Sequence, residues 1–177
     1  MAYFFKSTKS LLIIMLAVAS LLLTSCKTQQ ANLQQPENNS DNQNKIVKES
    51  KKVSTVITTA RTYIGTKYQY GGCSRSGIDC SGLIYTCYKS VNKELPRTAG
   101  AQSECGHPVK INELHKGDLL FFTDQKGHSK ITHVGLVTEV GKDHIKFIHA
   151  SSHKGVIEAD LLSAYYKPLF LKAVRII

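Results

Sequence analysis

The chain has 177 residues, of which 42% are hydrophobic and 8% aromatic, and its formal net charge is +10. This length suits one domain, together with terminal segments that lie outside it. The basic charge favours anionic surroundings, but the lysines are scattered and the sequence has no basic helix or aromatic platform. We therefore expect no nucleic-acid partner.

Residues 1–25 have the pattern of an export signal. Lys6 and Lys9 precede an apolar block at 11–23, which is too short to span a bilayer comfortably. The block runs into the motif LTSC, whose last residue is Cys26 and which resembles the lipobox of bacterial lipoproteins. That resemblance implies a lipid anchor on Cys26 and a place in the cell envelope, most simply on the periplasmic side. Loss of the two lysines leaves a net charge of +8, since 10 − 2 = 8.

Residues 26–52 are mainly Gln, Asn, Lys and Ser, with few apolar residues. Such a segment buries too little surface to offset its ordering entropy, so we expect a lipid-anchored, disordered tether. The folded domain is expected over 53–177. It opens with a helix whose apolar stripe runs from Val53 to Ile64, and Gly65 ends that helix.

The central motif of the domain is GIDCSGLI at 77–84. Apolar residues recur after it at a spacing of three to four, which predicts a helix over about 79–91. Asp79 or Ser81 can cap this helix by accepting hydrogen bonds from its first amides. Cys80 then lies in the first turn, where the helix dipole favours the thiolate, so it is a candidate nucleophile. The alternative is a small buried hydrophobic residue.

The remainder of the chain predicts short strands joined by turns. Gly117 begins a turn into the first of them, and residues 141–143 form a hairpin turn between two others. Helices that come first and hairpin-linked strands that follow predict an α+β fold, with helices packed on a mostly antiparallel sheet. The expected strands lie at 119–122, 132–140, 145–150, 156–157 and 169–177.

Two of the seven histidines lie within apolar strands. His133 opens one strand of the predicted hairpin, and His149 lies on the other, so the two imidazoles can share one hydrogen-bonded patch. Gly135, on the same face as His133, is expected to let the helix of Cys80 approach the sheet. A single strand histidine is more often a structural polar residue. Two on adjacent strands, together with Cys80, favour the set of nucleophile, base and orienting residue.

Six segments, in order, resemble the NlpC family of bacterial cell-wall cysteine peptidases, whose fold is papain-like. The resemblance covers 53–177 and implies Cys80 as nucleophile, His133 as base and His149 as the orienting residue. It also implies cleavage of peptidoglycan stem peptides, typically between γ-D-glutamate and a diamino acid. The six segments are GTKYQYGG at 65–72, DCSGL at 79–83, LPRT at 95–98, GDLLFF at 117–122, HVG at 133–135 and FIHA at 147–150.

The resemblance further implies three substrate-binding residues. Asp79 and Ser81 match positions that hold the amino end of the substrate in members that require a free N-terminal L-alanine. Tyr68 matches a tyrosine that lines the cleft and can donate to the developing oxyanion. Arg97 is interpreted as a structural ion-pair residue. Ala99 replaces a hydroxyl residue of many members and removes one polar contact.

Other functions are compatible with the same residues. An acyltransferase or amidase can resolve the same thioester, and a non-catalytic lipoprotein can bind wall peptide without cleaving it. The sequence has no Cys-x-x-Cys pair, which argues against structural zinc, and no Walker loop or dinucleotide fingerprint, so we expect no metal and no cofactor. In an exported protein Cys73 and Cys105 are the pair most compatible with a disulfide. The expected partners are peptidoglycan or its stem peptides and, through Cys26, a membrane, and a monomer is expected.

Overall fold

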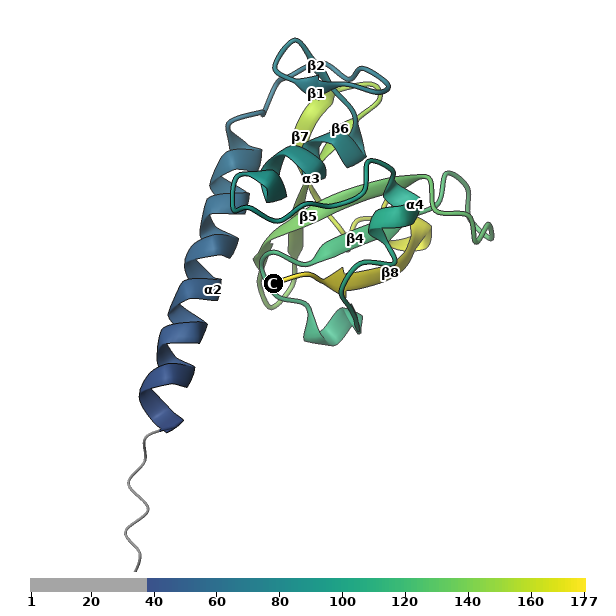
Figure 1. The fold of residues 1–177 in the computed structure, drawn as a ribbon. Coiled ribbons are helices and arrows are strands. Elements are labelled where there is room, and N and C mark those ends of the chain that lie inside the picture. Colours follow the sequence, from purple (N-terminus) through teal and green to yellow (C-terminus); the bar gives the residue numbers. More distant parts are fainter. Residues whose placement is uncertain (1–37) are drawn as a thin grey trace, which may run out of the picture. The chain divides into compact units, whose positions relative to one another are not determined.

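The centre of the fold is a six-stranded sheet in which all neighbouring strands are antiparallel. The computed structural model describes residues 38–177, so the predicted signal, Cys26 and the tether as far as residue 37 lie outside the described part. The strand order is β3-β8-β4-β5-β6-β7, and β1 pairs with β2 in a separate small sheet (Figure 1). The elements are the helices α2 (Asn38–Arg61), α3 (Cys80–Lys89) and α4 (Ala99–Gln102), the 3-10 helices η1 (Ile111–Glu113) and η2 (Lys167–Leu169), and the strands β1 (Cys73–Ser74), β2 (Gly77–Ile78), β3 (His107–Val109), β4 (Leu119–Phe122), β5 (His133–Val140), β6 (Ile145–Ser151), β7 (Gly155–Asp160) and β8 (Phe170–Arg175).

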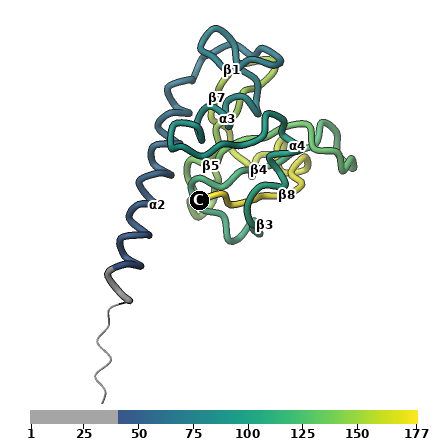
Figure 2. The backbone as a smooth tube through the Cα atoms, in the orientation of Figure 1, coloured from purple at the N-terminus to yellow at the C-terminus, as the bar shows by residue number. Residues whose placement is uncertain are grey.

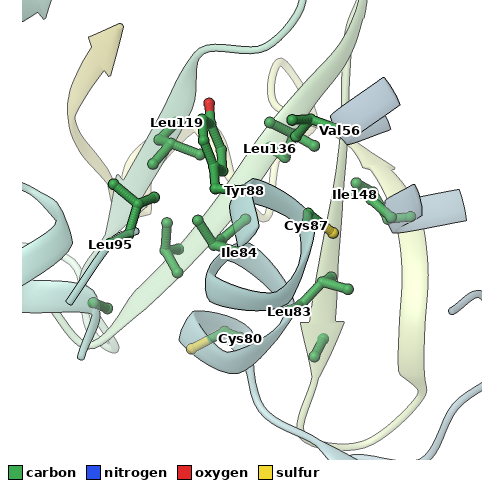
Figure 3. Close-up of a cluster of buried hydrophobic side chains, with 14 of the residues drawn as sticks. Val56, Cys80, Leu83, Ile84, Cys87, Tyr88, Leu95, Leu119, Leu136 and Ile148 are labelled. Atoms are coloured by element: carbon green, nitrogen blue, oxygen red, sulfur yellow. The ribbon is translucent and has the colours of Figure 1, made fainter. Parts of the chain in front are cut away.

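The second half of α2 and the whole of α3 pack on one face of the sheet. The apolar stripe of α3, which includes Leu83, Ile84 and Cys87, is buried against Leu136 of β5 and Ile148 of β6 (Figure 3). Burial of a large aliphatic side chain contributes about 1.5–3 kcal/mol, so this stripe fixes α3 firmly on the sheet. The helix that begins with Cys80 is therefore held over the two strands that carry His133 and His149.

The opposite face of the sheet has a core of its own. Alternation along β4 explains why the whole strand is apolar: Leu119 and Phe121 join the core under the helices, whereas Leu120 and Phe122 point to the other side. There they meet the segment 161–170, which closes this face. The predicted α+β fold with a mostly antiparallel sheet is confirmed.

Helix α2 begins much earlier than the sequence predicts. Residues 38–52, expected as part of the disordered tether, are helical and run without a break into the packed turns around Val56 and Ala60. Side chains from 41 to 51 are mostly exposed, and this half of the helix projects past the sheet (Figure 2). The physical reason is that a helix extends at little cost from a packed turn through residues that include neither Gly nor Pro. The prediction for 38–52 is thus corrected.

Other differences are local. Ile64 is 53% exposed, because α2 ends at Arg61, before the expected stop at Gly65. The predicted disulfide is absent, and Cys73 and Cys105 are both free thiols. Within residues 38–177 no helix is long and apolar enough to cross a membrane.

Candidate active site

Cys80 is the first residue of α3, and the residue before it explains why the helix starts there. Asp79 is extended, with φ −97° and ψ 176°, and its side chain accepts a hydrogen bond from the Gly82 amide, which is the geometry of an N-cap. Of the two caps that the sequence allows, Asp79 is the one used. Figure 3 shows Cys80 at the start of the helix, among the buried side chains of the cluster to which the following turns contribute.

The environment of the Cys80 thiol opposes ionisation. Burial raises its pKa above the ordinary value, and the charge of Asp79 adds to this effect. The backbone amides of Val134, Ser81 and Cys80 itself act in the opposite direction but do not compensate. The sequence predicts a thiolate favoured by the helix dipole, whereas in the structure the thiol is the favoured form. Attack by Cys80 therefore requires a base.

His133 and His149 form a hydrogen-bonded pair, and the residue that follows His133 contacts Cys80 through its backbone amide. His133 directly precedes Val134, whose amide faces Cys80, and Nε2 of His133 lies 2.7 Å from Nδ1 of His149. The other nitrogen of His149, Nε2, lies 2.9 Å from the hydroxyl of Tyr166. The structure thus joins two of the predicted catalytic residues by a hydrogen bond, brings the residue that follows His133 to Cys80, and extends the chain of contacts to a tyrosine.

Both imidazoles are neutral at neutral pH. Burial lowers the pKa of His133 to about 4, against a smaller opposing effect of Asp79. Burial, together with the neighbouring His133, lowers the pKa of His149 to about 3. A neutral His133 can accept a proton from Cys80. Nε2 of His133 is hydrogen-bonded to His149, so Nδ1 is the nitrogen of His133 that can accept the proton.

Gly135 has a different role from the one that the sequence suggests. A Cβ at this position would collide with the ring of Phe147 on the neighbouring strand β6, and not with α3. The Phe147 ring in turn stacks on His149, with centroids 5.1 Å apart and an interplanar angle of 28°. The missing side chain of Gly135 therefore makes room for the ring that supports the orienting histidine.

On the other side of Cys80, Asp79 and Arg97 form a partly buried ion pair, in which the Asp79 side chain is buried and that of Arg97 is 34% exposed. Nη1 and Nη2 of Arg97 each donate to one Asp79 oxygen at 2.8 Å, so the pair is bidentate. The Gly71 amide, the Gly82 amide and the Ser81 hydroxyl also donate to this carboxylate. Burial by itself would raise the pKa of Asp79, but these hydrogen bonds and the Arg97 charge lower it below the ordinary value.

The donors around Asp79 fill its capacity. A carboxylate offers about four lone-pair sites, and five N–H or O–H groups already point at this one. Ser81 also accepts from Nη1 of Arg97 at 3.0 Å. Arg97 thus has the structural role predicted for it. A substrate ammonium would have to displace Arg97 to reach either Asp79 or Ser81.

Two adjoining hollows meet at this site. One, of about 350 Å³, is lined by Asp79, Cys80 and Ala99, and the other, of about 400 Å³, by His133 and His149. Tyr68 lines both hollows. Burial raises the pKa of Tyr68, and the nearby Cys80 adds to the shift, so its hydroxyl is protonated and close to the thiol. This is the position expected of a cleft tyrosine, whereas its neighbour Tyr70 is 90% exposed.

A larger hollow of about 770 Å³ lies beside α2 and is lined by residues such as Ser54, Arg61 and His115. None of the predicted catalytic residues reaches it, so size alone does not locate the site. In the part of the chain that the structure describes, no three His, Cys, Asp or Glu side chains are grouped as metal ligands.

A cysteine that begins a helix, packed over antiparallel strands that carry a histidine pair, defines a protein of the papain-like cysteine-peptidase class. The fold of a solved NlpC/P60 family protein from Bacillus cereus agrees, with a TM-score of 0.62 and 32% sequence identity over 70% of this chain and 39% of that one. A model of the NlpC/P60 family matches residues 65–175. The chain therefore belongs to the NlpC/P60 family.

Three named proteins are similar to this chain in sequence. A gamma-D-glutamyl-L-lysine dipeptidyl-peptidase of Bacillus subtilis is 40% identical over 87 residues, which are 49% of this chain and 29% of that protein. A probable endopeptidase of Haemophilus influenzae is 31% identical over 172 residues, 97% of this chain and 99% of that protein. The Escherichia coli murein DD-endopeptidase MepS, also named a murein LD-carboxypeptidase, is 32% identical over 70% of this chain and 63% of that protein.

Tyr166 is the site residue that the sequence did not reveal. It lies in the segment between β7 and η2, where the chain has neither strand nor helix periodicity, and none of the six resembling segments includes it. The only signal was a pair of aromatic residues, Tyr165 and Tyr166, before Pro168.

Proposed function

We propose that this protein is a cell-wall cysteine endopeptidase that hydrolyses peptidoglycan stem peptides through a thioester on Cys80. The observation that carries the proposal is the hydrogen-bonded pair of neutral histidines that begins beside a helix-start thiol. A wall-binding protein without activity has no need of this arrangement. The family and the names of its relatives supply the substrate class.

The first half of the reaction forms the thioester. Nδ1 of His133 accepts the proton of the Cys80 thiol as the sulfur attacks the amide carbonyl carbon. The resulting oxyanion accepts hydrogen bonds from the Cys80 amide and, in this proposal, from the Tyr68 hydroxyl. The carbon–nitrogen bond then breaks, and the imidazolium of His133 gives its proton to the leaving amine.

The second half releases the acyl group. His133, neutral again, accepts a proton from water, whose oxygen attacks the thioester carbonyl. The carbon–sulfur bond breaks, the Cys80 sulfur regains the proton from His133, and the free acid leaves. His149 accepts a hydrogen bond from Nε2 of His133 throughout, so it orients the base without exchanging protons with substrate.

We assign the cleaved bond to the link between γ-D-glutamate and the diamino acid. The name of the Bacillus subtilis relative supports this assignment, and the name of MepS supplies the alternative, a DD bond. The Asp79 carboxylate accepts from Arg97, Ser81 and two backbone amides, and the Ser81 hydroxyl is hydrogen-bonded to Asp79 and Arg97. We therefore further propose that a free N-terminal amine is not required. Stem peptides that are still attached to the polymer are then substrates.

We also propose that the protein works as a lipoprotein of the cell envelope, anchored through Cys26 on the periplasmic side. The support is the motif that ends at Cys26 and the basic, apolar segment before it. Metabolic labelling with a lipid analogue, compared between the native chain and a Cys26→Ser variant, tests this assignment.

The function is tested by incubating the purified protein with peptidoglycan and with L-alanyl-γ-D-glutamyl-diaminopimelate, and identifying the products by mass spectrometry. We expect release at the γ-D-glutamyl bond, with none by a Cys80→Ala variant that keeps the native melting temperature. Products that carry a new amine in place of water would instead identify an acyltransferase. Binding of both substrates without any product would contradict enzymatic function.

A further inference from the structure

We propose that Tyr166 is a positioning residue of the active site, whose hydroxyl selects the tautomer of His149 that makes His133 a base. This inference deepens the proposed function and rests on it for its kinetic part. It starts from two contacts in series, His133 Nε2 to His149 Nδ1 at 2.7 Å and His149 Nε2 to the Tyr166 hydroxyl at 2.9 Å.

The proton positions along this chain are linked. For His133 to accept a proton at Nδ1, its own proton must sit on Nε2, where it is donated to Nδ1 of His149. A neutral imidazole that accepts at Nδ1 carries its proton on Nε2, so His149 must donate from Nε2. The group that receives that donation is the hydroxyl of Tyr166. In the opposite arrangement Nδ1 of His133 already carries a proton and cannot act as base.

The hydroxyl matters because His149 is enclosed. His149 is 2% exposed, with Phe147 stacked on its face, and its two ring nitrogens contact His133 and Tyr166. A buried N–H without an acceptor carries a large desolvation penalty. Without the Tyr166 oxygen, the catalytically useful tautomer would leave the Nε2 proton unpaired, and the balance would move toward the form in which His149 donates from Nδ1.

Neighbouring aromatic rings and a backbone turn hold the Tyr166 ring in place. It packs edge-on against Phe147, with centroids 4.9 Å apart and an angle of 89°, and also contacts Phe122 at 5.9 Å. The backbone carbonyl of Tyr166 accepts from the Leu169 and Phe170 amides, which closes the turn into β8. The ring is thus held by packing that a phenylalanine would keep, and the hydroxyl can be removed without disturbing the fold.

The adjacent Tyr165 offers a matched control. It has the same side chain, contacts the Tyr166 ring and is 68% exposed, but it makes no hydrogen bond to His149. Tyr165→Phe removes an equivalent hydroxyl one residue away. A general effect of hydroxyl loss in this segment would appear in both variants.

The test combines kinetics with nitrogen NMR of the histidine rings. For Tyr166→Phe we expect kcat to fall by about three- to tenfold with KM and melting temperature unchanged, and Tyr165→Phe to match the native protein. In a His149→Ala background, Tyr166→Phe should have no further effect, because the hydroxyl acts only through that ring. Equal losses in both backgrounds would overturn the proposal.

The NMR arm needs no substrate and stands even if the proposed function fails. We expect the native spectrum to show the His149 proton on Nε2, and the Tyr166→Phe spectrum to show a shift of population toward Nδ1. A native spectrum with the proton on Nδ1, or identical spectra for the two proteins, would overturn the proposal regardless of which bond the protein cleaves.

Discussion

Two polar clusters flank Cys80, and they are built in opposite ways. The cluster of Asp79 and Arg97 is charged, and its donors and acceptors are used within the protein. The chain from His133 through His149 to Tyr166 is neutral, and each of its members can either donate or accept. The charged cluster fixes where the cysteine helix begins, whereas the neutral chain can change its protonation during a reaction. The Asp79–Arg97 cluster thus stabilises the site, and the histidine chain on the other side of Cys80 makes it reactive.

The largest effect on activity is expected when His133, the base of the neutral chain, is removed. His133→Ala should lower kcat by about 10³-fold, within the range attributed to a positioned general base. His149→Gln should cost less, about 10- to 100-fold, because it removes only a hydrogen bond to a group that becomes charged. Steady-state kinetics with a fluorogenic stem peptide measures both. Equal losses for the two variants would contradict separate roles of base and orienting residue.

Removal of the Arg97 guanidinium should lower the free energy of unfolding. Arg97→Met leaves the buried Asp79 carboxylate without its partner, and we expect the free energy of unfolding to fall by about 2–4 kcal/mol. The matched control is Arg61→Met, because Arg61 pairs with Glu158 at 3.0 Å but is half-exposed, and its loss should cost less than about 1 kcal/mol. Denaturant unfolding measures both. Similar small losses would show that the charged cluster does not hold the site.

The neutral chain predicts a pH dependence of stability. Burial lowers the pKa of His133 to about 4 and that of His149 to about 3, from an ordinary value of 6.5. As the pH falls below 6.5, the two histidines of the unfolded chain become protonated before those of the folded protein. Their contribution to stability is therefore complete above pH 6.5 and is lost progressively as the pH approaches 4. Melting temperatures between pH 8 and pH 5 should fall less steeply for His149→Gln. Parallel curves for both proteins would argue against a buried neutral His149.

The smallest effect is expected when the N-terminal amine of the substrate is blocked. If Asp79 has no capacity for an ammonium, acetylation of the N-terminal L-alanine of a tripeptide substrate should change kcat/KM by less than about threefold. The comparison of free and acetylated peptide needs no variant. A loss of activity on the acetylated peptide alone would mean that the substrate amine displaces Arg97, and would restore the recognition role that the sequence suggests for Asp79 and Ser81.

Much of the fold follows from local patterns. The helix at Cys80 and the strands of the hairpin were predictable because apolar periodicity and turn residues agree there with the tertiary packing. The start of α2 at Asn38 was not, because a polar segment rich in Asn and Ser resembles a tether even where a packed helix follows it and extends through it. Strands β1 and β3 are only two and three residues long and carry no periodicity.

The site was predictable to the extent that it lies on regular elements. Cys80, His133 and His149 stand at a helix start and on paired strands, so their proximity could be inferred from topology. Tyr166 comes from an irregular segment, and its contact with His149 depends on how the second core packs. The ionisation of Cys80 was predicted in the wrong direction, since the dipole is visible in the sequence but the burial that outweighs it is not.

The central claim is that Cys80 carries the acyl half of a wall peptide during hydrolysis, and intact-mass analysis tests it most directly. The protein would be mixed with stem peptide, quenched in acid during turnover and weighed, with Cys80→Ala treated in parallel. We predict an adduct with the mass of the N-terminal fragment through glutamate, mapped to Cys80 and absent from the variant. Cleavage that persists in Cys80→Ala, with no adduct on the native protein, would contradict the account.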